Sequence, residues 1–507
     1  MAGIKALAKE TAIYGASSII GRFLNWCLVP LYVYIFPTGE YGIVSYLYSF
    51  TAVALVILNY GMETGFFRFA NKHERPDTVY TTSLLSVGST SLLFILLLTI
   101  FINPIATGMR LPNHRLYIWL LGVIVAIDAF SNMPFAYLRY KRKAIRFATV
   151  KFANIGINIA LNLFFLLLCP KLHRASPALI DWFYTPMGGQ AFGIGWIFVA
   201  NLISTLCVLA MLLPQLLGVR YTLDGALLRK MLKYSWPLLI LGVAGIMSQN
   251  MGQMIIPYLF SDQQAARSMV GIYGANIKIA IVMVMFTQAF RYAYEPFIFA
   301  QAGGKDGKKG AKAYCDAMKS FVILGLLIFL AVMFYLPVIK HFVSRAYWGG
   351  LDVVPIMMAA ELCCGVAFNL SLWYKLTDRT QWGMYLSVGT FIIMLALNLI
   401  FVPMIGIPRG YMGSAWAALI AYFIMMAASY FLGRRYYRLP YEIKRMGCYL
   451  LLAAALWLIG SRLCNFPSAP WLMYFVRTLL LCLYLLVVAR FEHLPLPLHR
   501  SRKTVGN

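Results

Sequence analysis

Long apolar stretches alternate with short polar connections along the whole chain. An α-helix needs about 20 predominantly apolar residues to cross the hydrocarbon of a bilayer. Fourteen stretches satisfy this, near residues 11–36, 40–62, 79–103, 115–138, 147–169, 189–213, 234–259, 270–300, 319–339, 352–374, 382–403, 411–433, 447–464 and 471–490. The pattern predicts an all-α polytopic membrane protein with about 14 transmembrane helices.

Composition supports a membrane protein and argues against an ordinary soluble protein and against a nucleic-acid-binding protein. Hydrophobic residues make up 61% of the chain, charged residues 12%, and the mean hydropathy is +0.74, which excludes an ordinary soluble protein. The formal charge of +27 could indicate nucleic-acid binding, but Lys and Arg occur in short clusters between apolar stretches. Membrane topology explains these clusters better, so no nucleic-acid partner is expected.

The distribution of basic residues predicts the orientation of the chain. With a cytoplasmic N-terminus, 31 Lys and Arg lie in or beside cytoplasmic segments, 9 lie in outside segments and 4 lie within spans. One missed or invented helix would invert every later connection and destroy this bias. Both termini are therefore predicted to be cytoplasmic.

Two parts of the chain resemble each other. Tyr140 and Lys141 in LRYKRKAIRFATVKFANIGINIALNLFF correspond to Tyr374 and Lys375 in LWYKLTDRTQWGMYLSVGTFIIMLALNLIF. More faintly, residues 40–43 (EYGI) echo residues 269–272 (MVGI). Repeats of six helices share one orientation and place a transported substrate at their interface. We predict an N-terminal lobe over 1–218, a C-terminal lobe over 219–435, and two further helices with a cytoplasmic tail over 436–507.

The first hairpin carries a family resemblance. Its sequence is YGASSIIGRFLNWCLVPLYVYIFPTGEYGIVSY, followed by LNYGMETGFFRF. Together with fourteen spans, it resembles the polysaccharide transporter branch of the multidrug/oligosaccharidyl-lipid/polysaccharide exporter superfamily. The resemblance implies a V-shaped, MATE-like fold of two six-helix lobes.

The same resemblance implies a function. Members are flippases that move undecaprenyl-diphosphate-linked oligosaccharides from the inner to the outer leaflet of the bacterial cytoplasmic membrane by alternating access, for O-antigen, capsule or related polysaccharides. The expected partners are this lipid-linked glycan, membrane lipids and the polysaccharide polymerase or ligase machinery.

The first span holds an arginine at membrane depth. Ser18, Arg22 and Asn25 share one helical face, at i, i+4 and i+7. A guanidinium within a bilayer is costly unless it faces water or a partner, and it binds a diphosphate through two hydrogen bonds. We expect this face to line a cationic cavity; the alternative is an arginine bonded to carbonyls or a carboxylate inside the lobe.

The eighth span supplies further candidates. Lys278 lies about two turns from its outer end, and Gln288, Arg291 and Glu295 share a face. Related lipid II flippases carry functional arginines on the first and eighth helices, which implies a role for Arg291 beside the first-span arginine. Arg291 is the expected second diphosphate ligand and Lys278 a weaker third, unless Arg291 and Glu295 only neutralise each other as an i,i+4 pair.

Three acids lie at or near membrane depth: Asp128, Glu295 and Glu361. Such groups exchange protons or bind cations during a transport cycle, and we consider H⁺ or Na⁺ coupling beside structural ion pairing. The fifth span places Asn154, Asn158 and Asn162 four residues apart. Hydrogen bonds between helices and recognition of sugar hydroxyls are the two interpretations of this stripe.

No motif for an enzyme or a cofactor appears. The nine cysteines have no CxxC spacing, the six histidines are scattered, and there is no nucleotide-binding motif, so neither a metal nor another cofactor is expected. A drug or organic-cation antiporter would want an acid-lined cavity. A membrane O-antigen ligase or polymerase would want a larger outside segment with catalytic groups, so a non-enzymatic transporter is the preferred function.

Overall fold

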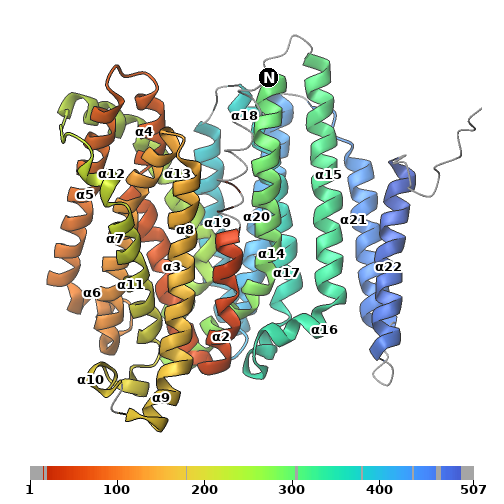
Figure 1. Ribbon diagram of the computed structural model, residues 1–507. Helices are drawn as coiled ribbons and strands as arrows, with labels where there is room; N and C mark the ends of the chain where they lie inside the picture. The colour runs from red at the N-terminus through yellow and green to blue at the C-terminus, as the bar shows by residue number, and fades with distance from the viewer. Residues whose placement is uncertain are drawn as a thin grey trace, which may run out of the picture. The chain divides into compact units, whose positions relative to one another are not determined.

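The structure is a computed structural model of the whole chain, and it describes residues 15, 17, 20–177, 180–302, 307–377, 379, 381–436, 439–463 and 470–492. Within these ranges the side chains of 190, 292–302, 307–311, 375, 376, 463 and 470 are outside the description. Every regular element in the described residues is a helix (Figure 1). The predicted all-α class is confirmed.

The predicted spans correspond to helices one by one. Twelve helices in the described ranges are long and apolar enough to cross a membrane, from Thr38–Ala70 to Trp471–Phe491. Two shorter apolar helices, Ile20–Ile35 and Gly195–Met211, coincide with the predicted first and sixth spans. The count of about 14 is confirmed, and hydropathy alone was sufficient to find it because each helix must match the bilayer by itself.

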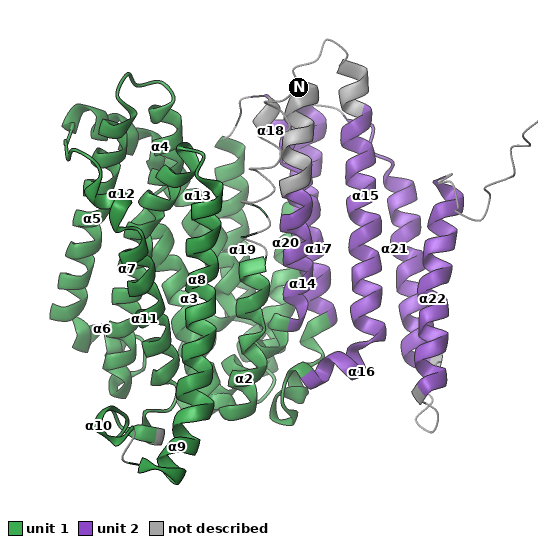
Figure 2. Ribbon diagram, in the orientation of Figure 1, with its two compact units in different colours: residues 1–278, 342–354, 379–425 green, residues 279–341, 355–378, 426–507 purple. Residues whose placement is uncertain are grey.

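The chain forms two compact units, coloured in Figure 2, and each contains segments distant in sequence. Unit 1 comprises residues 1–278, 342–354 and 379–425, and unit 2 comprises 279–341, 355–378 and 426–507. The boundary between the units falls inside helices α14, α17 and α20. The two-lobe division at residues 218 and 435 stays a prediction.

The elements of unit 1 are α2 (Leu28–Ile35), α3 (Thr38–Asn59), α4 (Met62–Ala70), α5 (Pro76–Ile100), α6 (Ile102–Gly108), η1 (Pro112–His114), α7 (Arg115–Tyr140), α8 (Ala144–Leu163), the π-helix η2 (Phe164–Leu168), α9 (Cys169–Ala175), α10 (Asp181–Tyr184), η4 (Gly189–Phe192), α11 (Gly195–Met211), α12 (Leu213–Leu217), α13 (Gly225–Leu259), η6 (Arg345–Gly350) and α19 (Gln381–Ile405). The helices α14 (Gln263–Ala302) and α20 (Tyr411–Tyr436) begin in it.

The elements of unit 2 are the later parts of α14 and α20, with α15 (Gly307–Phe334), α16 (Leu336–Ile339), most of α17 (Val353–Leu370), α18 (Leu372–Leu376), α21 (Ile443–Leu458), the π-helix η7 (Ile459–Leu463) and α22 (Pro470–Phe491). The short 3-10 helix η5 (Lys340–Phe342) ends at the boundary.

Local sequence determines where several helices begin. Pro76 occupies the first turn of α5, where its missing N–H costs nothing. The Asp224 carboxylate accepts a hydrogen bond of 2.9 Å from the Leu227 N–H and caps the N-terminus of α13. Gly61 separates α3 from α4 with a φ of +70°, a conformation that strongly favours glycine. Its carbonyl also accepts a bond of 3.3 Å from the Ser235 hydroxyl on α13.

The main apolar core of unit 1 lies among α3, α4, α5, α7 and α13. Its fully buried side chains include Met62, Phe66, Tyr80, Ala129 and Met231. This packing fixes α3, α7 and α13, which carry many of the polar groups described below.

A reciprocal contact joins the N-terminal parts of α3 and α14. A Cβ atom added to Gly42 would clash with the Arg267 carbonyl oxygen, and one added to Gly271 would clash with the Thr38 carbonyl oxygen. Both glycines belong to the faint repeat seen in the sequence, and each touches the residue four positions before the other. Mutual contacts of this kind arise between equivalent elements beside a two-fold axis, and small residues allow such close approach in membranes.

Unit 2 contains two arrangements of bonded charges. The Arg477 guanidinium on α22, buried with 5% exposure, donates to the carbonyl oxygens of Phe334 at 2.9 Å and Gly460 at 3.2 Å. These bonds join α22 to the end of α15 and to η7. The ammonium of Lys319 on α15 lies 2.6 Å from the Glu492 carboxylate and 3.6 Å from that of Glu442.

Candidate functional site

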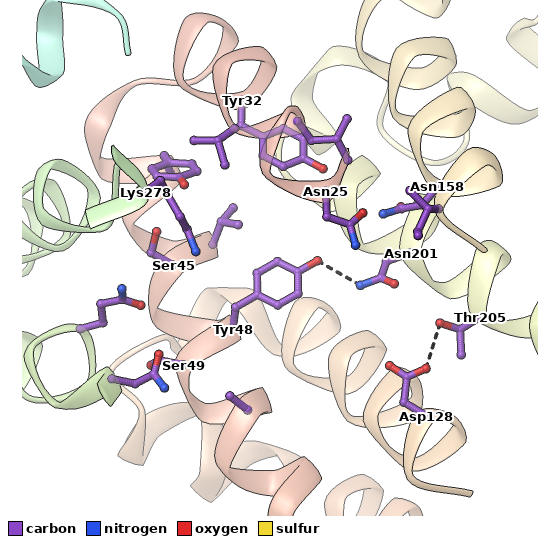
Figure 3. Close-up of a pocket in the computed structure, with 18 of the residues that line it drawn as sticks. Asn25, Tyr32, Ser45, Tyr48, Ser49, Asp128, Asn158, Asn201, Thr205 and Lys278 are labelled. Carbon is purple, nitrogen blue, oxygen red and sulfur yellow. Dashed lines mark hydrogen bonds between the residues drawn. The ribbon is translucent and has the colours of Figure 1, made fainter. Parts of the chain in front are cut away.

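Unit 1 encloses a cavity of about 520 Å³. Its walls come from the first span and from α3, α7, α8, α11, α13 and α14 (Figure 3). All of its lining residues belong to unit 1. Its polar lining side chains are Asn25, Tyr32, Tyr41, Ser45, Tyr48, Ser49, Asp128, Asn154, Asn158, Asn201, Thr205, Asn250, Gln253 and Lys278.

Helix α3 projects four polar side chains into the cavity, Tyr41, Ser45, Tyr48 and Ser49, at positions i, i+4, i+7 and i+8 of one helical face. The Tyr48 hydroxyl accepts a hydrogen bond of 3.1 Å from the Asn201 carboxamide on α11. The Ser49 hydroxyl donates to the Tyr46 carbonyl at 2.6 Å. The tyrosine and asparagine therefore hold each other in place across the cavity wall.

The asparagine stripe of α8 is divided between the cavity and the protein interior. Asn154 and Asn158 line the cavity, whereas Asn162 is buried with 1% exposure. The Asn162 amide donates a hydrogen bond of 3.0 Å to the Asn158 side-chain oxygen. The Asn162 side-chain oxygen accepts a hydrogen bond of 3.0 Å from the Tyr32 hydroxyl. The interhelical bond predicted from the stripe is present at Asn162, while the other two asparagines face the cavity.

Helix α13 contributes two more carboxamides, Asn250 and Gln253. The Asn250 amide donates to the Ile246 carbonyl of its own helix at 2.9 Å, which leaves its oxygen for the cavity. Gln253 is only 9% exposed and has no hydrogen-bond partner in the part of the chain that the structure describes. A buried amide without a partner is costly unless water or a ligand reaches it.

One cation and one anion line the cavity among the described residues, Lys278 and Asp128. Figure 3 shows them on opposite sides of Tyr48. The Asp128 carboxylate accepts a hydrogen bond of 3.4 Å from the Thr205 hydroxyl, whereas the Lys278 ammonium has no acidic partner in the described ranges. The Lys278 backbone carbonyl accepts a hydrogen bond of 2.6 Å from the indole N–H of Trp26, and this bond connects α14 to the first span.

The candidates of the first span are placed differently. Asn25 is exposed toward the cavity and lines it. Arg22, one turn earlier, is exposed and is not among the lining residues. Ser18 lies outside the described residues, so the shared face of the three stays a prediction.

The remaining candidates belong to unit 2. Arg291 is exposed, and its guanidinium carbon lies 5.6 Å from the centre of the Phe368 ring. Gln288 is half-buried on the same helix, and the side chain of Glu295 is outside the description. Glu361 is half-buried on α17. The structure thus brings Asn25, Lys278 and Asp128 to one cavity, and the roles of the unit 2 residues stay predictions.

Several lining residues escaped the sequence analysis although a signal was present. Asn201 and Thr205 on α11 are four residues apart, and Asn250 and Gln253 on α13 are three apart. Each pair marks one polar helical face within an apolar span, which is the criterion that singled out the α8 stripe. Applied to every span, it would have found these residues as well.

The cavity chemistry suits a ligand that has an uncharged polar part, rich in hydrogen-bonding groups, and one anionic group. Six carboxamides offer both donors and acceptors, and one ammonium offers a localised positive charge. Within the described ranges no group of three or more His, Cys, Asp and Glu side chains is placed to hold a metal ion.

Comparison with known proteins identifies a matching family. The sequence profile of the family described as polysaccharide biosynthesis protein matches residues 7–298, more than half of the chain. A search of curated protein sequences finds no match.

Solved structures share the fold at low sequence identity. The lipid II flippase MurJ, in an inward closed conformation, has a TM-score of 0.65 at 14% identity, over 96% of this chain and 99% of its own. An inward-facing MATE multidrug transporter of the MOP superfamily has a TM-score of 0.64 at 15% identity, over 82% and 94%. The MATE multidrug transporter DinF-BH has a TM-score of 0.60 at 16% identity, over 84% and 95%. These likenesses establish the MATE-like fold.

Proposed function

Because the chain belongs to the polysaccharide biosynthesis protein family, we propose that it is a flippase for undecaprenyl-diphosphate-linked oligosaccharide repeat units. It would move them from the inner to the outer leaflet of the bacterial cytoplasmic membrane by alternating access, for O-antigen, capsule or exopolysaccharide. The multi-pass topology and the flippase fold of a solved neighbour support this proposal.

The single observation that carries the proposal is the polar cavity of unit 1. Sugar hydroxyls and a diphosphate lose their hydrogen bonds to water on entering hydrocarbon, which costs many kcal/mol. A cavity with six carboxamides and the ammonium of Lys278 replaces these bonds while the lipid tail remains in the bilayer. An apolar drug would gain little from such a lining.

A leaflet assay tests the proposal. A strain lacking its own flippase is complemented with the wild type, Lys278→Ala, Arg22→Ala or Arg291→Ala, and lipid-linked repeat units reaching the outer leaflet are quantified. The wild type should restore translocation. Lys278→Ala should reduce it at least tenfold, because the diphosphate loses its charge-assisted bond in the cavity.

Controls make the result specific. Lys72→Ala and Arg75→Ala remove exposed basic residues between α4 and α5 and should leave translocation unchanged. Expression is measured for every variant. If no wild-type complementation occurs with any glycan background, the flippase proposal fails; if Lys278→Ala behaves like Lys72→Ala, the cavity is not the route of the diphosphate.

A second candidate is a drug or organic-cation antiporter, because Asp128 places a carboxylate in the cavity and MATE transporters share the fold. Efflux of fluorescent cations from cells carrying the wild type or Asp128→Asn separates the two functions. Asp128-dependent efflux without repeat-unit translocation would favour the antiporter.

Energy for net transport would come from an ion gradient coupled through Asp128, Glu295 or Glu361. Of these, Asp128 lies at the cavity with a hydroxyl donor beside it. Collapsing the proton or sodium gradient should slow wild-type translocation and have no further effect on Asp128→Asn. An unchanged gradient dependence in this variant would remove Asp128 from the coupling.

A further inference from the structure

The six carboxamides of the cavity differ in whether the protein already uses them. Three are hydrogen-bonded to neighbouring groups: Asn158, Asn201 and Asn250. Within the described part of the chain, the other three carry no side-chain hydrogen bond: Asn25, Asn154 and Gln253. The bonded carboxamides give the wall its shape, and the unbonded ones offer their full set of donors and acceptors to an occupant.

Gln253 is the most informative of the unbonded group. It is nine-tenths buried, and it lines the cavity from the C-terminal part of the long helix α13. A carboxamide has two N–H donors and an acceptor oxygen, so at this depth it requires a partner from the cavity. The first span and α8 add Asn25 and Asn154, so the unbonded amides reach the cavity from three different helices.

The charges of the cavity limit what these amides bind. Lys278 is the lining cation and Asp128 the lining anion among the described residues. If a diphosphate binds the Lys278 ammonium, no second cation remains among the described lining residues for an acidic sugar, and the other lining charge is the Asp128 carboxylate. A neutral sugar, in contrast, satisfies carboxamides through its hydroxyl and acetamido groups.

We propose that Asn25, Asn154 and Gln253 form the subsite for the sugar attached directly to the diphosphate, and that this sugar is neutral. The inference rests on the proposed function. It assigns the glycan selectivity of the protein to these three carboxamides, and the general affinity for the lipid diphosphate to Lys278.

Binding to short-chain analogues separates the two contributions. The full-length protein in lipid nanodiscs is titrated with citronellyl diphosphate, with the same compound linked to N-acetylglucosamine, and with the compound linked to glucuronic acid. The wild type should bind the N-acetylglucosamine probe more tightly than the sugar-free diphosphate. The glucuronate probe should bind no more tightly than the sugar-free one.

The variants Asn154→Leu and Gln253→Leu replace the amide with a branched apolar side chain. Each variant should bind the N-acetylglucosamine probe about three- to tenfold more weakly than the wild type, as expected for one or two lost hydrogen bonds. Its affinity for the sugar-free diphosphate should stay unchanged. Lys278→Met should lower the affinity for all three probes. Asn71→Leu, which alters an exposed asparagine at the end of α4, is the matched control and should change nothing.

The outcomes distinguish this inference from the proposed function. Equal weakening of the sugar-bearing and sugar-free probes by both leucine variants, or no weakening by either, would overturn the sugar subsite. Tighter binding of the glucuronate than of the N-acetylglucosamine probe would overturn its neutrality. Failure of the wild type to bind any diphosphate probe would overturn the proposed function and the subsite with it. Thermal melting confirms that each variant is folded, and either leucine variant alone suffices for the test.

Discussion

In unit 1 polar side chains surround a cavity, whereas in unit 2 the charged side chains of Arg477 and Lys319 are bonded to carbonyl oxygens and to carboxylates. Gln253 in unit 1 has no partner in the described ranges, while Arg477 in unit 2 donates to two carbonyl oxygens and Lys319 contacts a carboxylate at 2.6 Å. Both kinds of residue appear in the sequence as polar interruptions of apolar spans. Polar side chains at membrane depth therefore indicate a ligand site where the structure leaves them without a partner, and a structural role where they are bonded.

The largest expected effect concerns the close packing of unit 1. Gly271→Leu would force a side chain against the Thr38 carbonyl oxygen, a backbone atom that cannot rotate away. Overpacking costs about 1–3 kcal/mol and more where backbone must move, so we expect a variant that melts far below the wild type or does not fold. Fluorescence-detected size exclusion after heating measures this.

The matched control is Gly245→Ala on α13, where no atom lies within 4 Å of the new Cβ. It should keep the wild-type Tm or raise it slightly, because alanine favours a helix over glycine by about 1 kcal/mol. A Gly271→Leu protein as stable as this control would refute the packing argument.

The next effect tests the bonded charges of unit 2. Arg477→Met removes the two hydrogen bonds to the carbonyls of Phe334 and Gly460 and leaves these oxygens without this donor. Stability should fall by about 1–3 kcal/mol, while translocation per folded molecule should stay at the wild-type level. Arg462→Met, at an exposed arginine of η7, should leave the Tm unchanged. Lost translocation in a folded Arg477→Met protein would show that this charge serves transport.

A smaller effect is expected from pH. Burial alone would raise the pKa of the Glu492 carboxyl, but hydrogen bonds from Lys319 and Tyr449 and the charges of Lys319 and Arg445 hold it below its usual value of 4.5. Because the folded state favours the charged form, this group stabilises the protein fully above the unfolded-state pKa, and its contribution fades as the pH falls through the lower folded-state pKa.

The melting temperature of the wild type should therefore drop when the pH falls below about 4.5, and Glu492→Gln should show a smaller drop at a lower starting Tm. Melting curves between about pH 6 and pH 3.5 measure the difference. Parallel pH profiles for the two proteins would contradict the assignment.

The smallest effect on stability is expected for an asparagine that lines the cavity of unit 1. Asn154→Leu removes a carboxamide that has no hydrogen bond in the described part of the chain, so the free energy of unfolding should change by less than about 0.5 kcal/mol. The same thermal assay measures it. A loss comparable to that of Arg477→Met would mean that Asn154 serves structure rather than ligand binding.

The sequence predicts the helices far better than the site. Each span is a local property, since its backbone must satisfy its own hydrogen bonds and its length must match the bilayer. The cavity depends on how helices distant in sequence pack together. Asn201 and Gln253 meet the same space because α11 and α13 are held by the core of unit 1, and no local pattern contains that information.

The charged candidates show the same limit. Hydropathy identified Arg22 and Lys278 by one rule, that a cation within a span is costly. Only packing separates them, because Lys278 lines the cavity and Arg22, although one turn from Asn25, does not. A rule based on single helices cannot rank cations that differ only in the direction in which they point.

The close packing of α3 against α14 around Gly42 and Gly271 also determines when this part of the protein can fold during synthesis. The two glycines are separated by roughly 230 residues, which take on the order of 10 to 50 s to translate. During that interval the N-terminal part of α3 is already made without the helix that covers it. Newly made chains must therefore wait for α14 before this seam closes, and slowed translation of the second half should prolong the time for which the first half is open to proteolysis.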